Sequence, residues 1–134
     1  MYSTYKEPNV AEEDIECYKI VFKNGLNYFS ALFFSFNYKF GEEYEEAQFQ
    51  KTNPDGYIYR GFHTFNELED AEREFRRNFN TGLFVIAKCV IPKGSRYWEG
   101  GNGWSRNERC SEKIRIVAVK FRTSGEWINY KLYP

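Results

Sequence analysis

The sequence predicts an α+β fold: a single domain over residues 1–134, with a mixed or mostly antiparallel sheet of five or more strands and one main helix at about 66–79. Three observations lead to this prediction. Several segments are apolar or alternate apolar with polar residues, and glycine, proline and asparagine punctuate them. Only one stretch carries apolar residues at clear helical spacing. The chain also has the length of one ordinary domain.

The first third of the chain predicts an arm followed by a β-hairpin. Residues 1–13 are polar, so we expect a loose N-terminal arm. The alternating run 15–23 predicts a strand, and Asn24-Gly25 predicts a two-residue hairpin turn. The partner strand is then expected over 26–36. The acidic stretch 42–50 predicts a helical turn or a solvated loop.

The helix follows an extended segment at 57–65. Asn66 is the expected N-cap, and Glu69 three residues later completes a capping-box pattern. The buried stripe of the helix is expected to consist of Leu68, Ala71, Phe75 and Phe79.

The second half of the chain predicts three more strands. The apolar run 83–91 indicates a central strand covered on both faces. Strands are also expected over 112–122 and, more briefly, 126–133. Residues 93–113 hold four glycines, two tryptophans and three arginines, and they predict either a mobile lid or a β-hairpin whose aromatic rings cover the sheet.

Composition narrows the function classes. The 19 basic and 19 acidic residues balance, which argues against binding to a nucleic-acid backbone. The three cysteines, Cys17, Cys89 and Cys110, lack metal or redox spacing, so we expect no metal site and a reducing cytoplasm. No signal peptide is recognised, and the apolar run 29–36 is too short to span a membrane. Dinucleotide and P-loop motifs are absent, so no cofactor is expected.

The candidate site combines aromatic rings, which can stack on a nucleobase, with arginines, which can bind phosphates. His63 lies just before the helix, where ligands often meet backbone amides; the alternative is a histidine that fixes the strand–helix corner. No nucleophile, base and orienting group can be assembled, so no catalytic residue is predicted. The expected ligand-binding residues are Tyr59, Arg60, His63, Arg96, Tyr97, Trp98, Trp104, Arg106, Arg109 and Glu112.

Several segments resemble a family of small phage and bacterial proteins that has no established activity. The resemblance covers most of residues 17–122 and implies a phage or bacterial origin. It rests on Cys17-Tyr18-Lys19-Ile20-Val21, Phe36-Asn37-Tyr38-Lys39-Phe40-Gly41, Gly61-Phe62-His63, Glu69-Asp70-Ala71 and Ser111-Glu112-Lys113-Ile114-Arg115-Ile116.

The order of three segments is also similar to that of the ADP-ribosyltransferase fold: 57–75, the turn Ile91-Pro92-Lys93-Gly94, and a strand that begins at Glu112. That resemblance implies an enzyme in which Arg60 or His63 holds NAD and Glu112 stabilises an oxocarbenium-like transition state. The chain has His63-Thr64-Phe65 in place of a Ser-Thr-Ser segment, and Glu112 without a second glutamate.

We therefore expect a non-enzymatic protein that binds a nucleotide-like small molecule, in a phage an anti-defence protein that sequesters a host immune signalling nucleotide. An ADP-ribosyltransferase-like enzyme and a protein-interaction module that inhibits a host protein are the two alternatives. Neither a membrane nor a nucleic acid is an expected partner, and a homo-oligomer stays open.

Overall fold

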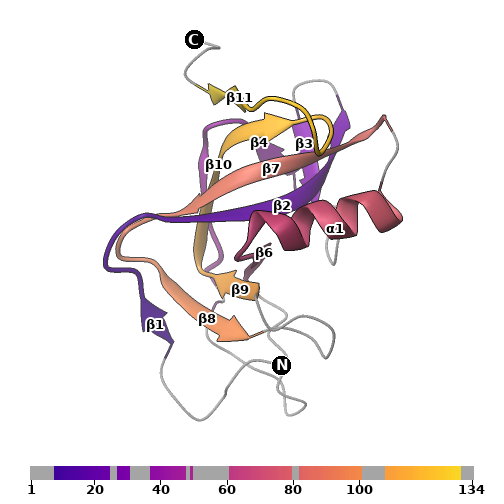
Figure 1. The fold of residues 1–134 in the computed structure, drawn as a ribbon. Coiled ribbons are helices and arrows are strands. Elements are labelled where there is room, and N and C mark those ends of the chain that lie inside the picture. Colours follow the sequence, from indigo (N-terminus) through magenta and orange to yellow (C-terminus); the bar gives the residue numbers. More distant parts are fainter. Residues whose placement is uncertain are drawn as a thin grey trace.

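The computed structural model shows an antiparallel sheet with one helix (Figure 1). The residues that it describes are 8–24, 27–30, 37–47, 49, 61–79, 82–100 and 108–130. Within them lie eleven strands, and every pairing between strands is antiparallel. The fold is therefore mostly β with one helix, which confirms the α+β prediction in its broad form.

The main path of the sheet runs β1-β8-β9-β6-β2-β7-β10-β11. The elements are β1 (Asn9–Val10), β2 (Ile15–Asn24), β3 (Asn27–Ser30), β4 (Asn37–Lys39), β5 (Glu43–Glu45), β6 (Phe62–Phe65), α1 (Leu68–Asn78), β7 (Phe84–Ile91), β8 (Arg96–Gly100), β9 (Glu108–Ser111), β10 (Lys113–Lys120) and β11 (Ile128–Asn129).

The long strands β2, β7 and β10 form the centre of the fold, with β7 between the other two. One face of these strands packs against α1, where Phe75 meets Ile20 and Ile86. The opposite face carries a second buried cluster that includes Val21 and Ile116. Because β7 is covered on both faces, its sequence is almost continuously apolar, as predicted for a central strand.

The remaining strands curl the sheet around the second cluster. β2 continues past β6 to pair with β3, and β3 pairs with β4. The turn after β4 contains Gly41, whose φ of 83° suits glycine and whose N–H donates to the carbonyl of Ile116. This contact brings β5 against β10, so distant strands enclose one core.

The helix is where the sequence places it, and its predicted stripe is confirmed. Ala71 and Phe75 are buried, and Leu68 and Phe79 pack beside them. The predicted N-cap is wrong: Glu67, in an extended conformation and without a side-chain cap, occupies that position. Asn66 lies one residue too early to bond the first free amides of the helix.

Three other local predictions need correction. The arm expected over 1–13 is wrong for residues 9–11, because β1 pairs with β8 and the Ala11 N–H donates to the carbonyl of Ser95. The partner strand expected over 26–36 is confirmed for β3, which pairs with β2, but it is not one continuous strand, because β3 also pairs with β4. The acidic stretch was expected to form a helical turn or a loop, but part of it forms the short strand β5, which pairs with β10.

The glycine- and tryptophan-rich segment also differs from the predicted lid. Residues 96–100 and 108–111 form β8 and β9, which pair with each other, as the alternative β-hairpin interpretation proposed. Residues 101–107 lie outside the described part of the chain. Among the described residues, no helix is long and apolar enough to cross a membrane.

Candidate functional site

The strands β6, β9 and β8 lie side by side and gather the expected ligand-binding residues. β9 is the middle strand of this β6–β9–β8 sheet. His63, Arg96, Tyr97, Trp98, Arg109 and Glu112 all lie on it or directly at its end. The other four expected residues, Tyr59, Arg60, Trp104 and Arg106, lie outside the described residues.

The register divides these residues between two faces. Trp98 is opposite Cys110, and Cys110 is opposite His63, so these three share one face, called here the Trp98 face. Glu99 is opposite Arg109, which is opposite Thr64. Their row, together with Tyr97, defines the Arg109 face. A strand sends successive side chains to opposite faces, so the neighbours Tyr97 and Trp98 cannot act on the same side.

The Trp98 face is an aromatic wall with a histidine at its edge. Trp98 and Cys110 are buried together with Phe49. The Cys110 Sγ lies 3.7 Å from Nε2 of the half-buried His63. Trp98 is only 6% exposed, and its indole Nε1 has no hydrogen-bond acceptor in the described structure.

Gly61 allows β6 to approach this wall closely. Its φ is 153°, and an added Cβ would lie 2.4 Å from the Cys110 Sγ. The glycine before His63 is thus explained by packing, because any side chain would collide with the thiol. Sequence reasoning missed Cys110 as a site residue, since 47 positions separate it from His63 and a lone cysteine carries no spacing signal.

The chemistry of the Trp98 face is not that of an activated thiol. Burial raises the pKa of the Cys110 thiol to about 12, so the group is protonated at neutral pH. A nucleophilic cysteine needs a lowered pKa and access to substrate. The Cys110 thiol therefore contacts His63 in its protonated form, although each residue type is common in catalytic pairs.

Arg96 and Glu112 close one end of the Trp98 face as an ion pair. Arg96 donates from both Nε and Nη2 to the two carboxylate oxygens of Glu112, with an Nε–Oε1 distance of 3.2 Å. Its guanidinium also lies 5.6 Å from the Phe49 ring centroid. The hydrogen bonds from Arg96 lower the pKa of Glu112 below its ordinary value. Glu112 thus largely balances the charge of Arg96, which makes Arg96 a weak partner for a phosphate.

The Arg109 face is more strongly polar. Arg109 lies 5.8 Å from the centroid of the Tyr97 ring, and its Nε is 3.4 Å from a carboxylate oxygen of Glu99. That ion pair leaves the Nε without a hydrogen bond. Beside it, the buried Thr64 hydroxyl also lacks a hydrogen-bond partner in the described structure, although the Cys17 thiol is close enough to interact weakly.

Unsatisfied polar atoms are concentrated on this sheet. Buried polar groups in folded proteins are almost always hydrogen-bonded, and an exception usually marks a missing water, ion or ligand. Among the described residues, every buried side-chain atom without a partner lies on β6, β9 or β8 or at the end of β6. These atoms are Thr64 Oγ1, Asn66 Oδ1, Trp98 Nε1 and Arg109 Nε.

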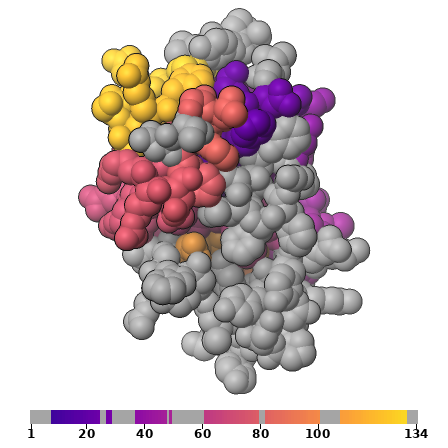
Figure 2. All heavy atoms as spheres, turned by 90° about the vertical axis from the view of Figure 1, so that its right-hand side faces the viewer, coloured from indigo at the N-terminus to yellow at the C-terminus, as the bar shows by residue number. Residues whose placement is uncertain are grey.

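Part of this region reaches the molecular surface. In Figure 2 a small orange area, which by its colour belongs to the β8–β9 part of the chain, appears directly below helix α1. The helix and the C-terminal strands form the surface above it.

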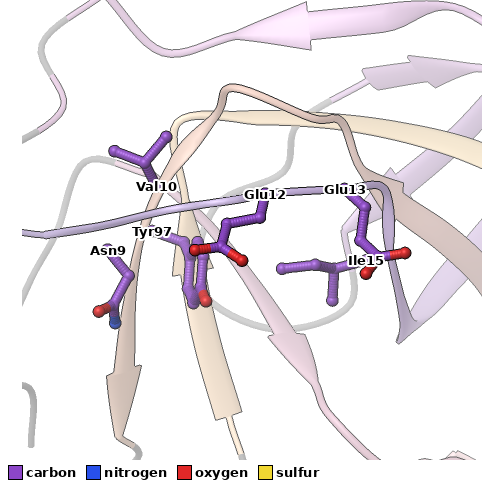
Figure 3. A pocket seen from close by; sticks show the side chains of 6 residues that line it. All are labelled: Asn9, Val10, Glu12, Glu13, Ile15 and Tyr97. Carbon is purple, nitrogen blue, oxygen red and sulfur yellow. The ribbon is translucent and has the colours of Figure 1, made fainter.

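An open pocket of about 530 Å³ lies at the β1 edge of the sheet. In Figure 3 the side chains of Asn9, Glu12 and Tyr97 lie on the same side of the chain segment 9–15, whereas the side chain of Val10 points to the other side. Glu12 and Glu13 line the pocket with carboxylates, and both are exposed. An acidic lining repels phosphate, so this pocket does not suit a nucleotide.

No protein-family model, curated protein or solved structure matches the chain. Function is therefore inferred from the candidate site itself. Within the described ranges, no group of three or more histidine, cysteine, aspartate or glutamate residues could hold a metal ion.

Proposed function

We propose that this protein binds a nucleotide-like small molecule without transforming it, and that the planar part of the ligand lies on the Trp98 face. The observation that carries the proposal is the buried indole N–H of Trp98, which has no acceptor in the described structure. Leaving a buried donor unpaired costs about 1–3 kcal/mol. A ligand that offers an in-plane acceptor would recover that free energy.

A nucleobase fits this wall better than a flexible aliphatic molecule does. Its ring edge carries nitrogen and oxygen acceptors, and its faces stack on aromatic side chains for about 1–3 kcal/mol per base. Phe49 and Trp98 supply aromatic rings, both almost fully buried in the described structure, and His63 lies beside Cys110. Arg60 and Arg106 would bind the phosphates; these two arginines lie outside the described residues and are proposed from the sequence.

Two features favour binding over group transfer. Both carboxylate oxygens of Glu112 accept hydrogen bonds from Arg96, so the carboxylate is engaged where a transferase would need it to face the reacting sugar. The Cys110 thiol is buried and protonated, which makes it a poor nucleophile. In a phage, a protein that holds a nucleotide intact would serve to sequester a host immune signal.

Thermal shift with a panel of cyclic dinucleotides, ADP-ribose and NAD tests the proposal. We expect one class to raise the melting temperature, and we expect Trp98→Phe to weaken that response about five- to tenfold. The substitution keeps an aromatic ring and removes the N–H, a loss of about 1 kcal/mol or more. Trp127→Phe is the matched control, because Trp127 packs between Lys88 and Lys120, away from β8.

Mass spectrometry of the bound ligand separates binding from turnover. The ligand should be recovered with unchanged mass after prolonged incubation with the protein. Consumption of NAD would replace the binding proposal with a transferase. A flat response to the whole panel would remove the nucleotide from the proposal.

A further inference from the structure

A row of polar side chains crosses the Arg109 face into the core. Thr64 on β6 is directly opposite Arg109 on β9. β6 also pairs with β2 through Phe65 and Tyr18. Continuing that antiparallel register by one residue places Lys19 opposite Thr64. Directly opposite side chains share a face and lie about 4.5–5.5 Å apart at Cβ, so one hydroxyl lies between two cationic side chains.

Lys19 is an unusual residue for this position. It is only 6% exposed, although lysine is almost never fully buried unless it is paired. Its Nζ donates to the carbonyl of His63 and lies 5.8 Å from the centroid of the Tyr38 ring. Within the described part of the chain, no carboxylate forms an ion pair with it. Two of the three ammonium hydrogens therefore lack an acceptor.

Lys120 is also a buried lysine, but it has a carboxylate partner. Lys120 is 4% exposed, and its Nζ donates to the Glu72 carboxylate at 3.0 Å and to the carbonyl of Thr123 at 3.1 Å. A buried charge is usually balanced in this way. Lys19 has the same burial, but no carboxylate of the described residues forms an ion pair with it, and burial lowers the pKa of its amine.

The other two members of the row also have unused hydrogen-bonding capacity. The Thr64 hydroxyl is buried and without a partner, and so is the Arg109 Nε. The Cys17 thiol lies close enough to the Thr64 hydroxyl for a weak interaction. Glu99 balances Arg109 only in part, because its own side chain is 53% exposed.

We propose that Lys19, Thr64 and Arg109 form a binding site for a small oxyanion. The site lies on the face of the β6–β9–β8 sheet opposite the Trp98 face. The ammonium, the hydroxyl and the guanidinium offer donors from three adjacent strands, the arrangement that a phosphate, sulfate or carboxylate group requires. The anion enters from the Arg109 end, where the side chain is 18% exposed, and takes over the contact that Glu99 makes.

The site is independent of the proposed nucleotide function. The two sets of side chains project from opposite faces of the same strands, so one small ligand cannot contact both. Loss of nucleotide binding in Trp98→Phe would leave the oxyanion site intact, and the reverse also holds.

The test measures the melting temperature of the full chain in inorganic phosphate, sulfate or acetate, with sodium chloride adjusted to constant ionic strength at pH 7. We expect phosphate or sulfate at ten times its dissociation constant to raise the melting temperature by about 4 °C. A response to acetate instead would assign the site to a carboxylate, which is the same donor chemistry with a planar ligand.

Three variants locate the effect. Lys19→Met should abolish the response, and Thr64→Val, which keeps the side-chain shape, should weaken anion affinity about fivefold. Lys120→Met combined with Glu72→Gln is the matched control, and it should keep the full response. If Lys19→Met does not fold, Thr64→Val decides the outcome.

The proposal is overturned by any of three results. One is an equal response to chloride, which would mean an adventitious ion only. The second is an unchanged response in both Lys19→Met and Thr64→Val. The third is no response to phosphate, sulfate or acetate, each titrated against sodium chloride at constant ionic strength.

Discussion

Replacing Gly61 with alanine should destabilise the protein by about 2–6 kcal/mol. The backbone φ of 153° is strained for a residue with a side chain, at about 1–3 kcal/mol. The new Cβ would also lie 2.4 Å from the Cys110 Sγ and 3.2 Å from the carbonyl oxygen of Ser111. Overpacking of this kind typically costs a further 1–3 kcal/mol.

The contact with Cys110 allows a sharper test than the single substitution. Cys110→Ala removes the sulfur and should cost about 1 kcal/mol on its own, as the loss of a small buried group. The double variant should then be more stable than the sum of the two single effects predicts, by about 1 kcal/mol or more. Such coupling would show that the thiol is what Gly61 avoids.

Urea unfolding followed by tryptophan fluorescence measures these differences, provided that the m-value stays constant among the variants. Gly82→Ala is the matched control, because no atom lies within 4 Å of its added Cβ and its φ is not positive. We expect it to change stability by about 0.5 kcal/mol or less. The reasoning fails if Gly61→Ala is as harmless as the control, or if its cost is the same with and without the Cys110 sulfur.

Three further predictions follow from burial and ionisation. Phe75→Ala should cost about 3–5 kcal/mol in chemical denaturation, because its ring is buried between α1 and the central sheet; a cost below about 1 kcal/mol would contradict that packing. All three cysteines should resist a thiol reagent at pH 8 in the native protein and react after denaturation, since all are buried; rapid labelling of any one would disprove it. Glu112→Gln should lower stability at pH 7 by about 1 kcal/mol or less. Because the pKa of Glu112 is lowered from 4.5 in the folded state, the wild-type advantage should disappear as the pH falls below that value, and a difference that persists at pH 2 would contradict the ion pair.

Local patterns determined much of the secondary structure. The apolar run of β7 and the helical spacing in α1 follow from which faces are buried, and that information is contained within a dozen residues. The sequence of β2 alternates, but residues 17–21 in it are all buried. The expectation that His63, Tyr97, Trp98 and Arg109 belong to one region came from two segments of the sequence, the one that leads into the helix and the one at 93–113. The structure brings them onto three adjacent strands.

The sequence by itself thus determined the elements and the neighbourhood of the candidate site, whereas the tertiary structure decided how that neighbourhood is arranged. Strand pairing is set by long-range packing and register, which no local window contains. The pairing of β9 with both β6 and β8 places Cys110 against His63 and separates Tyr97 from Trp98. The pairing of β6 with β2 brings Lys19 beside β6, where its Nζ donates to the carbonyl of His63, 44 positions away along the chain.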